Sequence, residues 1–305
     1  MRVRFAIASL AVLPSALLSA QVDRITIRMI PAPNQTLHVR TLMETTMNAV
    51  TDPSSGRSLP IPPMSTNIKT VTDSTSTVGP TDAQGHYQAR VVFDTASYTA
   101  MLNGQPMPAN GQAVPGSPPA ELIGAAMTFS YDDQGKVVDV AMDAAMPASL
   151  AGPLKQMLTA AMGAAPPMTL SVGESITVPA RLDLPNPAAP NTLAMQMTGE
   201  TRYTLTSVTF DGADRIAHLK SATTGVVNQA SPAASAGPRF TFEIRTSSEG
   251  TSDVNIDRGI VLHTEQRMTI DGAMRISAPP HVTPAPPIPP MLIHGTMRIS
   301  SDLAK

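Results

Sequence analysis

The stretch LHVRTLMETTMNA, residues 37–49, decides the fold class. Its odd positions carry Leu, Val, Thr, Met and Ala, while its even positions include His38, Arg40, Glu44 and Asn48. A period of two is typical of a β-strand with one apolar and one polar face, as in antiparallel sheets. Such a strand would reach roughly 43 Å at about 3.3 Å per residue, although five or six residues are usual. We therefore expect unusually long antiparallel strands.

Similar alternation recurs along most of the chain, over residues 64–78, 86–95, 192–210, 215–223, 240–245 and 262–270. Two hairpins are expected, at 127–142 and at 254–261, each with an acidic turn that contains a glycine. Gly135 supplies the positive φ that a short turn of the first hairpin needs. The shared form of the two hairpins indicates a weak internal duplication, with halves at about 21–165 and 166–277.

A helix is expected at about 150–162. Its apolar residues recur with a period of 3.6, which is typical of a helix with one buried face. They are Leu150, Leu154, Met157, Leu158, Ala161 and Met162. Long amphipathic strands need a cover on one face, and this helix is the available cover. The expected fold class is thus mainly β: a large curved antiparallel sheet or half-barrel, with one helix over its concave apolar face.

The last 28 residues hold a proline-rich segment and a repeated motif. Residues 278–290 are rich in proline and predict an extended polyproline spacer. In the following segment, 291–305, the sequence GTMRIS at 295–300 nearly copies GAMRIS at 272–277. We expect 296–300 to form a strand that pairs back onto the protein's own sheet. Pairing with a neighbouring copy of the chain is the alternative.

The first twenty residues have the features of a secretory signal. Arg2 and Arg4 precede an apolar run over residues 5–18, and Ser19-Ala20 ends this run. The run is too short for a membrane-spanning helix, which needs about 20 residues. We expect cleavage near Ala20–Gln21, no integral membrane span afterwards, and a periplasmic or extracellular location.

Composition excludes several classes of partner. Without Arg2 and Arg4, 19 basic side chains remain beside 23 acidic ones, a net charge of −4, and no Lys/Arg cluster is present. This argues against binding to nucleic acid or to an anionic membrane surface. The chain has no cysteine, so its fold depends on burial without disulfides. Aromatic residues make up only 3% while methionine reaches 19 residues, so methionines would give any core or cavity a flexible lining.

Catalytic and metal-binding motifs are missing from the sequence. It contains no cysteine nucleophile, no Gly-x-Ser-x-Gly elbow, no His-Glu-x-x-His and no phosphate-binding glycine loop. The six histidines are scattered, and no two of them lie within five residues of each other. We therefore expect no catalytic residue, no metal site and no cofactor, and we interpret the chain as a non-enzyme.

Several of these segments together resemble a known family. They are the hairpin at 127–142, the helix at 150–162, the segment PMTLSVGESI at 167–176, and the RYTL strand at 202–205, which is turned by Asp211-Gly212. The chain is similar over about 24–277 to an uncharacterised exported bacterial domain family with a lipoprotein-carrier-like (LolA-like) half-barrel fold. This resemblance implies that fold, binding of an apolar ligand and no catalytic residues. The chain departs from the family in its few aromatic residues.

Two functions follow from this reading. The first is a non-catalytic structural or interaction module of the cell envelope, which would use its strand edges and proline-rich tail. The second is binding or carriage of an apolar ligand, such as a lipid or a lipoprotein acyl chain, in the concave face of the sheet. The expected lining residues are Met43, Met47, Met127, Phe129, Leu154, Met157 and Leu158.

Overall fold

The computed structural model describes residues 24–28, 32–53, 62–107, 123–133, 136–143, 155, 167–186, 189–230, 239–277 and 288–304. The expected signal segment lies outside these ranges. So do the expected helix, apart from Lys155, and the proline-rich spacer up to residue 287.

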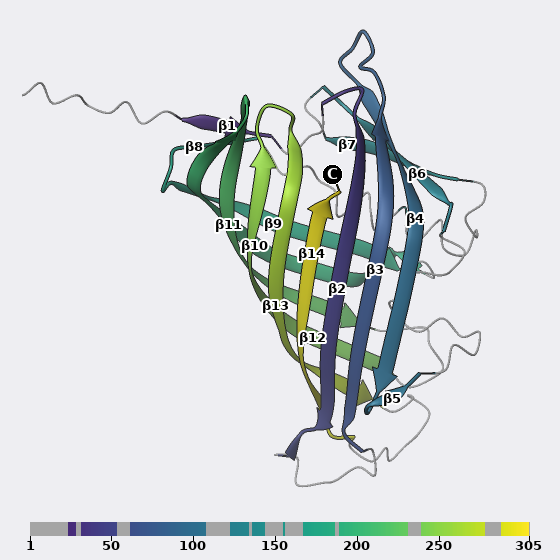
Figure 1. Ribbon diagram of the computed structural model, residues 1–305. Coiled ribbons are helices and arrows are strands. Elements are labelled where there is room, and N and C mark those ends of the chain that lie inside the picture. The colour runs from purple at the N-terminus through teal and green to yellow at the C-terminus, as the bar shows by residue number, and fades with distance from the viewer. Residues whose placement is uncertain are drawn as a thin grey trace, which may run out of the picture.

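Twelve antiparallel strands form one large sheet (Figure 1). Its order is β7-β6-β4-β3-β2-β14-β13-β12-β11-β10-β9, and β5 adds to β4. The mainly β, antiparallel architecture is confirmed, with strands as long as the 23 residues of β10. The bounds are β2 Thr36–Thr51, β3 Met64–Val78, β4 Tyr87–Leu102, β5 Gln105–Pro106, β6 Ala126–Tyr131, β7 Val137–Met142, β9 Ser175–Asn186, β10 Ala189–Asp211, β11 Asp214–Ala230, β12 Arg239–Asn255, β13 Ile260–Ser277 and β14 Met291–Leu303.

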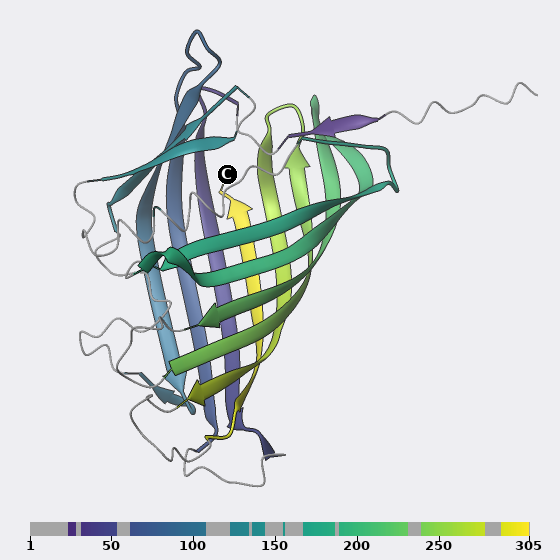
Figure 2. The same ribbon diagram turned by 180° about the vertical axis from the view of Figure 1, so that it is seen from behind.

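The sheet curls strongly but does not close on itself. β13 lies beside β14, and the strands of the second half, β9 to β13, run across behind β2, β3 and β4 in Figure 1 and in front of them in Figure 2. The two edge strands, β7 and β9, do not pair with each other. One face of β2–β4 is therefore turned toward the crossing strands, and the opposite face is turned to the outside.

Glycines permit a close approach of neighbouring backbones in the long strands. Gly199 in β10 and Gly225 in β11 lie opposite each other in the middle of their strands. A Cβ atom on Gly199 would collide with the backbone oxygen of Thr224, and one on Gly272 of β13 would collide with the backbone oxygen of Glu243. Only a hydrogen atom fits between the neighbouring backbones at these points. Glycine within a strand often marks this kind of close approach.

The strand β14 joins the two halves of the sheet. It pairs with β13 on one side and with β2 on the other, whereas β2 and β13 do not pair with each other. The expected strand at 296–300 is thus part of a longer strand in the middle of the sheet. Its partner on β13 includes the copied motif 272–277, but the two strands run antiparallel, so Gly272 faces Ile293 rather than its counterpart Gly295.

A separate two-stranded sheet covers one end of β10–β12. It consists of β1, Ile25–Ile27, and β8, Met168–Leu170. The sequence suggests that 168–184 holds two strands around the turn at Gly173, but β8 pairs with β1 and not with β9. The apolar side chains of this small sheet are buried against the large one, in a cluster of Ile27, Met168, Leu170, Leu205, Ala217, Leu219 and Val254.

Glu174 fixes the chain between β8 and β9. Its Oε2 accepts a hydrogen bond from the Ser171 N–H at 2.9 Å, and its Oε1 accepts one from Arg24 Nη2 at 3.1 Å. The Ser171 backbone hydrogen bond and the Arg24 charge hold the pKa of Glu174 below its usual value. These contacts attach the residue before β1 to the turn after β8.

A second apolar cluster lies at the other end of the sheet, around the hairpin β6–β7. This hairpin is the one expected at 127–142, and it buries Ala125, Met127, Phe129, Val137 and Val140. Tyr131 stacks on Tyr87 of β4, with ring centroids 4.9 Å apart and planes 6° from parallel. The cluster therefore connects β4, β6 and β7 through their side chains.

The expected covering helix is not among the elements of the described residues. Of 150–162, only Lys155 is described; its conformation is helical, and its Nζ lies 2.9 Å from Asp139 Oδ1 of β7. Within the described ranges, no helix has the length and apolarity that a membrane crossing requires.

The close approach of the Thr224 backbone to Gly199 leads to a prediction. We expect Gly199→Ala to destabilise the protein by roughly 1–3 kcal/mol, the usual cost of overpacking, because its Cβ has no space beside Thr224. Gly79→Ala is the matched control, since a Cβ there would lie 3.5 Å from the nearest atom, the Gln88 oxygen. Urea unfolding measures both, and equal free energies of unfolding for the two variants would show that a Cβ atom at position 199 is tolerated.

The tyrosines predict a late alkaline titration. All four, Tyr87, Tyr98, Tyr131 and Tyr203, have pKa values raised by desolvation, and that of Tyr87 reaches about 12. The folded state holds these protons more tightly than the unfolded state. The associated stability is therefore complete below pH 10 and is lost as the pH rises from about 10 to about 12.

Absorbance at the tyrosinate band measures this directly, because the chain has no tryptophan. The phenol groups of the native protein should titrate at a higher pH than those of the urea-unfolded protein. The free energy of unfolding should decrease over the same pH range. Coincident titration curves for the native and unfolded protein would show that the phenols are solvated.

Candidate functional site

The pairing register divides the side chains of the large sheet between two faces. Met43 of β2 lies opposite Thr70 of β3 and Ile299 of β14, and Thr70 in turn lies opposite Tyr98 of β4. Because side chains alternate along each strand, these four residues share one face, which we call the inner face. The intervening positions, such as Glu44 in β2, form the outer face.

The inner face carries no charge over its central region. Residues that are paired in register across neighbouring strands form a row. In the rows that contain residues 41–49 of β2, the described inner-face positions of all strands from β4 to β9 hold only apolar residues, Thr, Ser, Gln, Tyr and Gly. Its apolar side chains are for the most part only partly buried. Examples are Met43, Met47, Ile68, Met268, Met297 and Ile299. The chain therefore presents a wide uncharged surface that its described residues do not fully cover.

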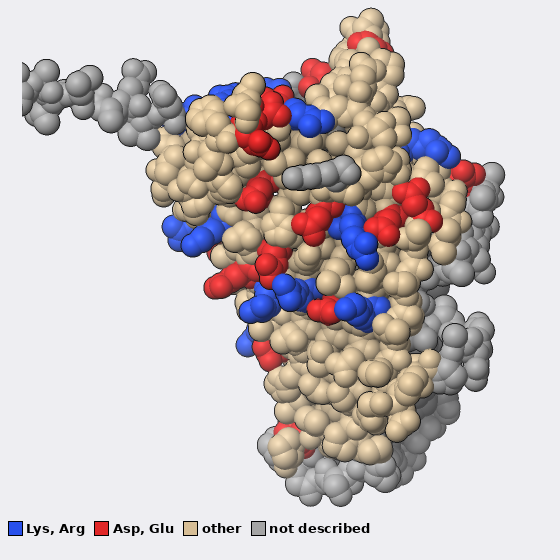
Figure 3. Space-filling view, viewed as in Figure 1, with Lys and Arg blue, Asp and Glu red and all other residues tan. Residues whose placement is uncertain are grey.

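The outer face carries the charged groups, and acidic residues alternate there with arginine or histidine across neighbouring strands. One row contains, in spatial order, Asp73, Arg40, Asp302, His263, Asp253 and His218, contributed by β3, β2, β14, β13, β12 and β11. Space-filling representation shows such acidic and basic groups interleaved over this side of the sheet (Figure 3). This is the side that is turned away from the crossing strands, so the inner face lies on the side turned toward them.

Specific contacts connect the members of this row. His263 Nδ1 lies 2.6 Å from Asp302 Oδ1, and His218 Nδ1 lies 2.7 Å from Asp253 Oδ1. Arg40 Nε lies 3.9 Å from Asp73 Oδ1. These groups are substantially exposed, so each pair contributes little on its own. The row instead sets the register, because a slip by one residue would bring every charge to the uncharged face.

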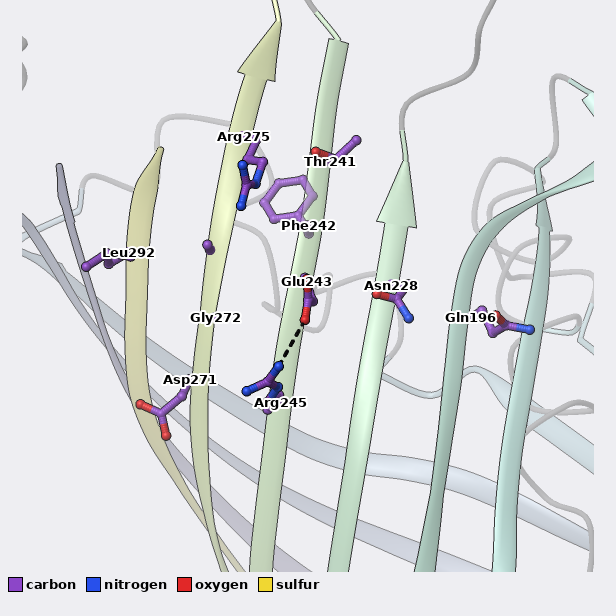
Figure 4. Close-up of a pocket in the computed structure, with 11 residues that line it drawn as sticks. Gln196, Asn228, Thr241, Phe242, Glu243, Arg245, Asp271, Gly272, Arg275 and Leu292 are labelled. Atoms are coloured by element: carbon purple, nitrogen blue, oxygen red, sulfur yellow. Dashed lines mark hydrogen bonds and ion pairs between the residues drawn. The ribbon is translucent and has the colours of Figure 1, made fainter. Parts of the chain in front are cut away.

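The outer face is hollowed where β10 to β14 bend (Figure 4). The hollow has a volume of about 650 Å³. Two acidic and two basic side chains line it, Glu243 and Asp271 with Arg245 and Arg275, and Arg245 Nη2 lies 3.4 Å from Glu243 Oε1. A hollow with balanced and exposed charges has no strong preference for an anion or a cation. Its polar lining comprises Gln196, Asn228, Thr241, Glu243, Arg245, Asp271 and Arg275.

The structure separates the expected lining residues into two groups. Met43 and Met47 lie on the inner face of β2 and are partly exposed. Met127 and Phe129 lie on β6 and are only 6% and 4% exposed, inside the cluster of the β6–β7 hairpin. Met127 shares a row with Leu37, six residues or about 20 Å along β2 from Met43. Leu154, Met157 and Leu158 lie outside the described residues.

Two hydroxyl groups beside Met43 are more informative than the expected set. Thr70 Oγ1 and Tyr98 OH are buried and have no hydrogen-bond partner, and Thr70 is only 7% exposed. Burial raises the pKa of the Tyr98 phenol, so this group is neutral at ordinary pH. The alternation over 64–78 could have placed Thr70 on the apolar face. No sequence signal could have shown that its hydroxyl lacks a partner.

No arrangement for metal binding is present in the described part of the chain. There, no three His, Asp or Glu side chains converge in a way that could hold an ion. The histidines of the outer face instead contact single aspartates, as in His263–Asp302 and His294–Asp271.

Comparison with known proteins gives no family assignment. No protein-family model matches the chain, and no curated protein matches it. A solved structure described as "Asymmetric conductivity of engineered proteins" is 8% identical, over 87% of this chain and 100% of that chain, with a TM-score of 0.26. OpdQ of Pseudomonas aeruginosa is 9% identical, over 88% of this chain and 99% of that chain, with a TM-score of 0.19. Likeness at these TM-scores supports no conclusion about fold or function.

Proposed function

We propose that the protein is a non-enzymatic exported binding protein that holds an apolar ligand against the inner face of its curved sheet. One observation carries this proposal: the inner face is uncharged over its central rows, yet side chains such as Met43 and Met47 remain partly exposed. Large exposed apolar surfaces in soluble proteins usually mark a binding site.

The chemistry of the inner face suits an elongated apolar chain. Burial of apolar surface contributes about 25 cal/mol for each Å², so partly exposed methionines and isoleucines leave free energy available to a ligand. Methionine adapts to irregular shapes through its flexible thioether. The row of Thr45 places Met297 and Met268 side by side on β14 and β13, close to Met43 and Met47 of β2.

We further propose that the helix at 150–162 covers the inner face near β6 and β7. The ion pair of Lys155 with Asp139 locates one residue of the segment beside the edge strand β7, at a position that alternates with the inner-face residue Val140. Leu154, Met157 and Leu158 would then extend the lining from the β6–β7 cluster. We also keep membership of the LolA-like half-barrel family as a proposal, since that family would combine a curved sheet, one covering helix and an apolar ligand.

A role as a structural or interaction module receives less support from the sheet edges. An edge strand can bind a partner strand through its free backbone groups. At one edge, β9 contains Pro179, which lacks an N–H donor. At the other edge, β7 has only six residues, and its Asp139 is paired with Lys155. Both edges thus have features that discourage strand addition.

The proposal predicts that a charge on the inner face abolishes ligand binding. We expect Met47→Lys to weaken binding of the neutral fluorescent probe N-phenyl-1-naphthylamine by at least about tenfold, since an unpaired charge next to an apolar ligand is costly. Asn48→Lys is the matched control: it adds the same charge one residue away, on the exposed outer face. It should leave probe affinity within about twofold.

Probe fluorescence titrations measure both affinities, and circular dichroism verifies that each variant is folded. Two results would contradict the proposal. One is failure of the wild-type protein to bind the probe, and the other is equal binding by both variants. Either result would favour the interaction module instead.

A further inference from the structure

Thr70 and Tyr98 carry buried hydroxyls on the inner face that have no hydrogen-bond partner. A third such hydroxyl, Tyr87 OH, lies at the start of β4, where its ring stacks on Tyr131. Several other hydroxyl groups of the inner face pair across neighbouring strands. Thr41 Oγ1 lies 2.8 Å from Ser301 Oγ, Ser252 Oγ lies 2.6 Å from Thr264 Oγ1, and Thr201 Oγ1 lies 3.0 Å from Thr223 Oγ1. Thr70 and Tyr98 lie directly opposite each other in register, and yet neither hydroxyl has a partner.

Such groups are costly for a folded protein. A buried hydroxyl without a hydrogen bond loses its water without compensation, at a cost of about 1–3 kcal/mol. Here two of them belong to residues paired in register between β3 and β4, in the row of Met43 and Ile299. A valine at 70 and a phenylalanine at 98 would fill nearly the same volume without this cost. Two unpartnered hydroxyls in one row are explained if a bound group uses them.

We infer that Thr70 and Tyr98 form the polar anchor of the ligand site, and that the ligand is an uncharged lipid with an ester or hydroxyl group, of the acylglycerol class. This inference rests on the proposed function. A hydroxyl can donate to an ester oxygen and accept from an alcohol, so the pair suits a neutral polar group. The apolar chain of the ligand would extend over Met43 and Met47.

The lack of charge on the inner face selects against ionised lipids. A carboxylate or phosphate placed there would be desolvated with no cationic side chain in the central rows to compensate it. The basic groups of the same strands, such as Lys69 and Arg298, belong to the outer face and pair there with Glu44 and Glu265, each at 3.0 Å.

The test compares three ligands of equal chain length: monodecanoylglycerol, decanoate and decane, each used to displace N-phenyl-1-naphthylamine at neutral pH. The wild-type protein should bind monodecanoylglycerol about tenfold more tightly than decane, since one or two hydrogen bonds are worth this much. Decanoate should bind more weakly than monodecanoylglycerol.

Two variants remove the hydroxyls while keeping the shape of the side chains: Thr70→Val and Tyr98→Phe. Each should reduce the preference for monodecanoylglycerol over decane to about threefold or less, with decane affinity unchanged. Neither should lower the melting temperature, because the hydroxyl that is removed has no partner in the ligand-free protein. Thr41→Val is the control, since it removes an inner-face hydroxyl that is already bonded to Ser301. It should lower stability and leave the preference unchanged.

The outcomes separate this inference from the proposed function. If no ligand displaces the probe, or the probe itself does not bind, the proposed function fails and the inference fails with it. If all three ligands bind but Thr70→Val and Tyr98→Phe keep the wild-type preference, only the polar anchor is refuted. Tighter binding of decanoate than of monodecanoylglycerol would refute the uncharged ligand class.

Discussion

The pairing of β14 between β2 and β13 is the interaction on which the rest of the sheet depends. The strands before it in space, β7 to β2, come from the first half of the chain, and those after it, β13 to β9, come from the second half. Backbone hydrogen bonds along both sides of β14 connect these halves. Side chains reinforce both sides of the junction. Arg298, Asp302 and His294 of β14 contact Glu265, His263 and Asp271 of β13, and Ser301 of β14 contacts Thr41 of β2.

This junction also aligns the two faces of the sheet across both halves. Because every central charge lies on the outer face and none on the inner face, a shift of β14 by one residue would destroy the separation. Gly199, Gly225 and Gly272 allow the strands of the second half to lie close together where they cross the inner face. Register, charge pattern and curvature together leave an uncharged surface on one side of the sheet, with Thr70 and Tyr98 in its middle rows.

Local features of the fold could be predicted from the sequence, but its long-range features could not. Alternation over 37–49 indicates the strand that the structure extends to Thr36–Thr51, and the hairpin at 127–142 forms as β6–β7. Alternation reports only which side chains share a face, so it cannot reveal which strands are neighbours. For this reason, the pairing of β8 with β1 and the central place of β14 could not be read from the sequence.

In the candidate site, too, local features could be predicted from the sequence and long-range features could not. Composition and alternation place Met43 and Met47 on an apolar face, as the structure does, but hydropathy alone cannot distinguish them from Met127 and Phe129, which are core residues of another cluster. The orphan hydroxyls depend on distances across β3 and β4, which no pattern along one strand records. The internal duplication of the two halves remains a prediction.

The central place of β14 has a consequence for the order of folding. Thr41 and Ser301 meet across the junction although 260 residues separate them in sequence. While a ribosome is still making residues before 291, β2 and β13 each lack a neighbour, and the nascent chain exposes two long unpaired edges. Contacts of such sequence separation form slowly, so the two edges stay open to aggregation until β14 has been made and has paired with both of them.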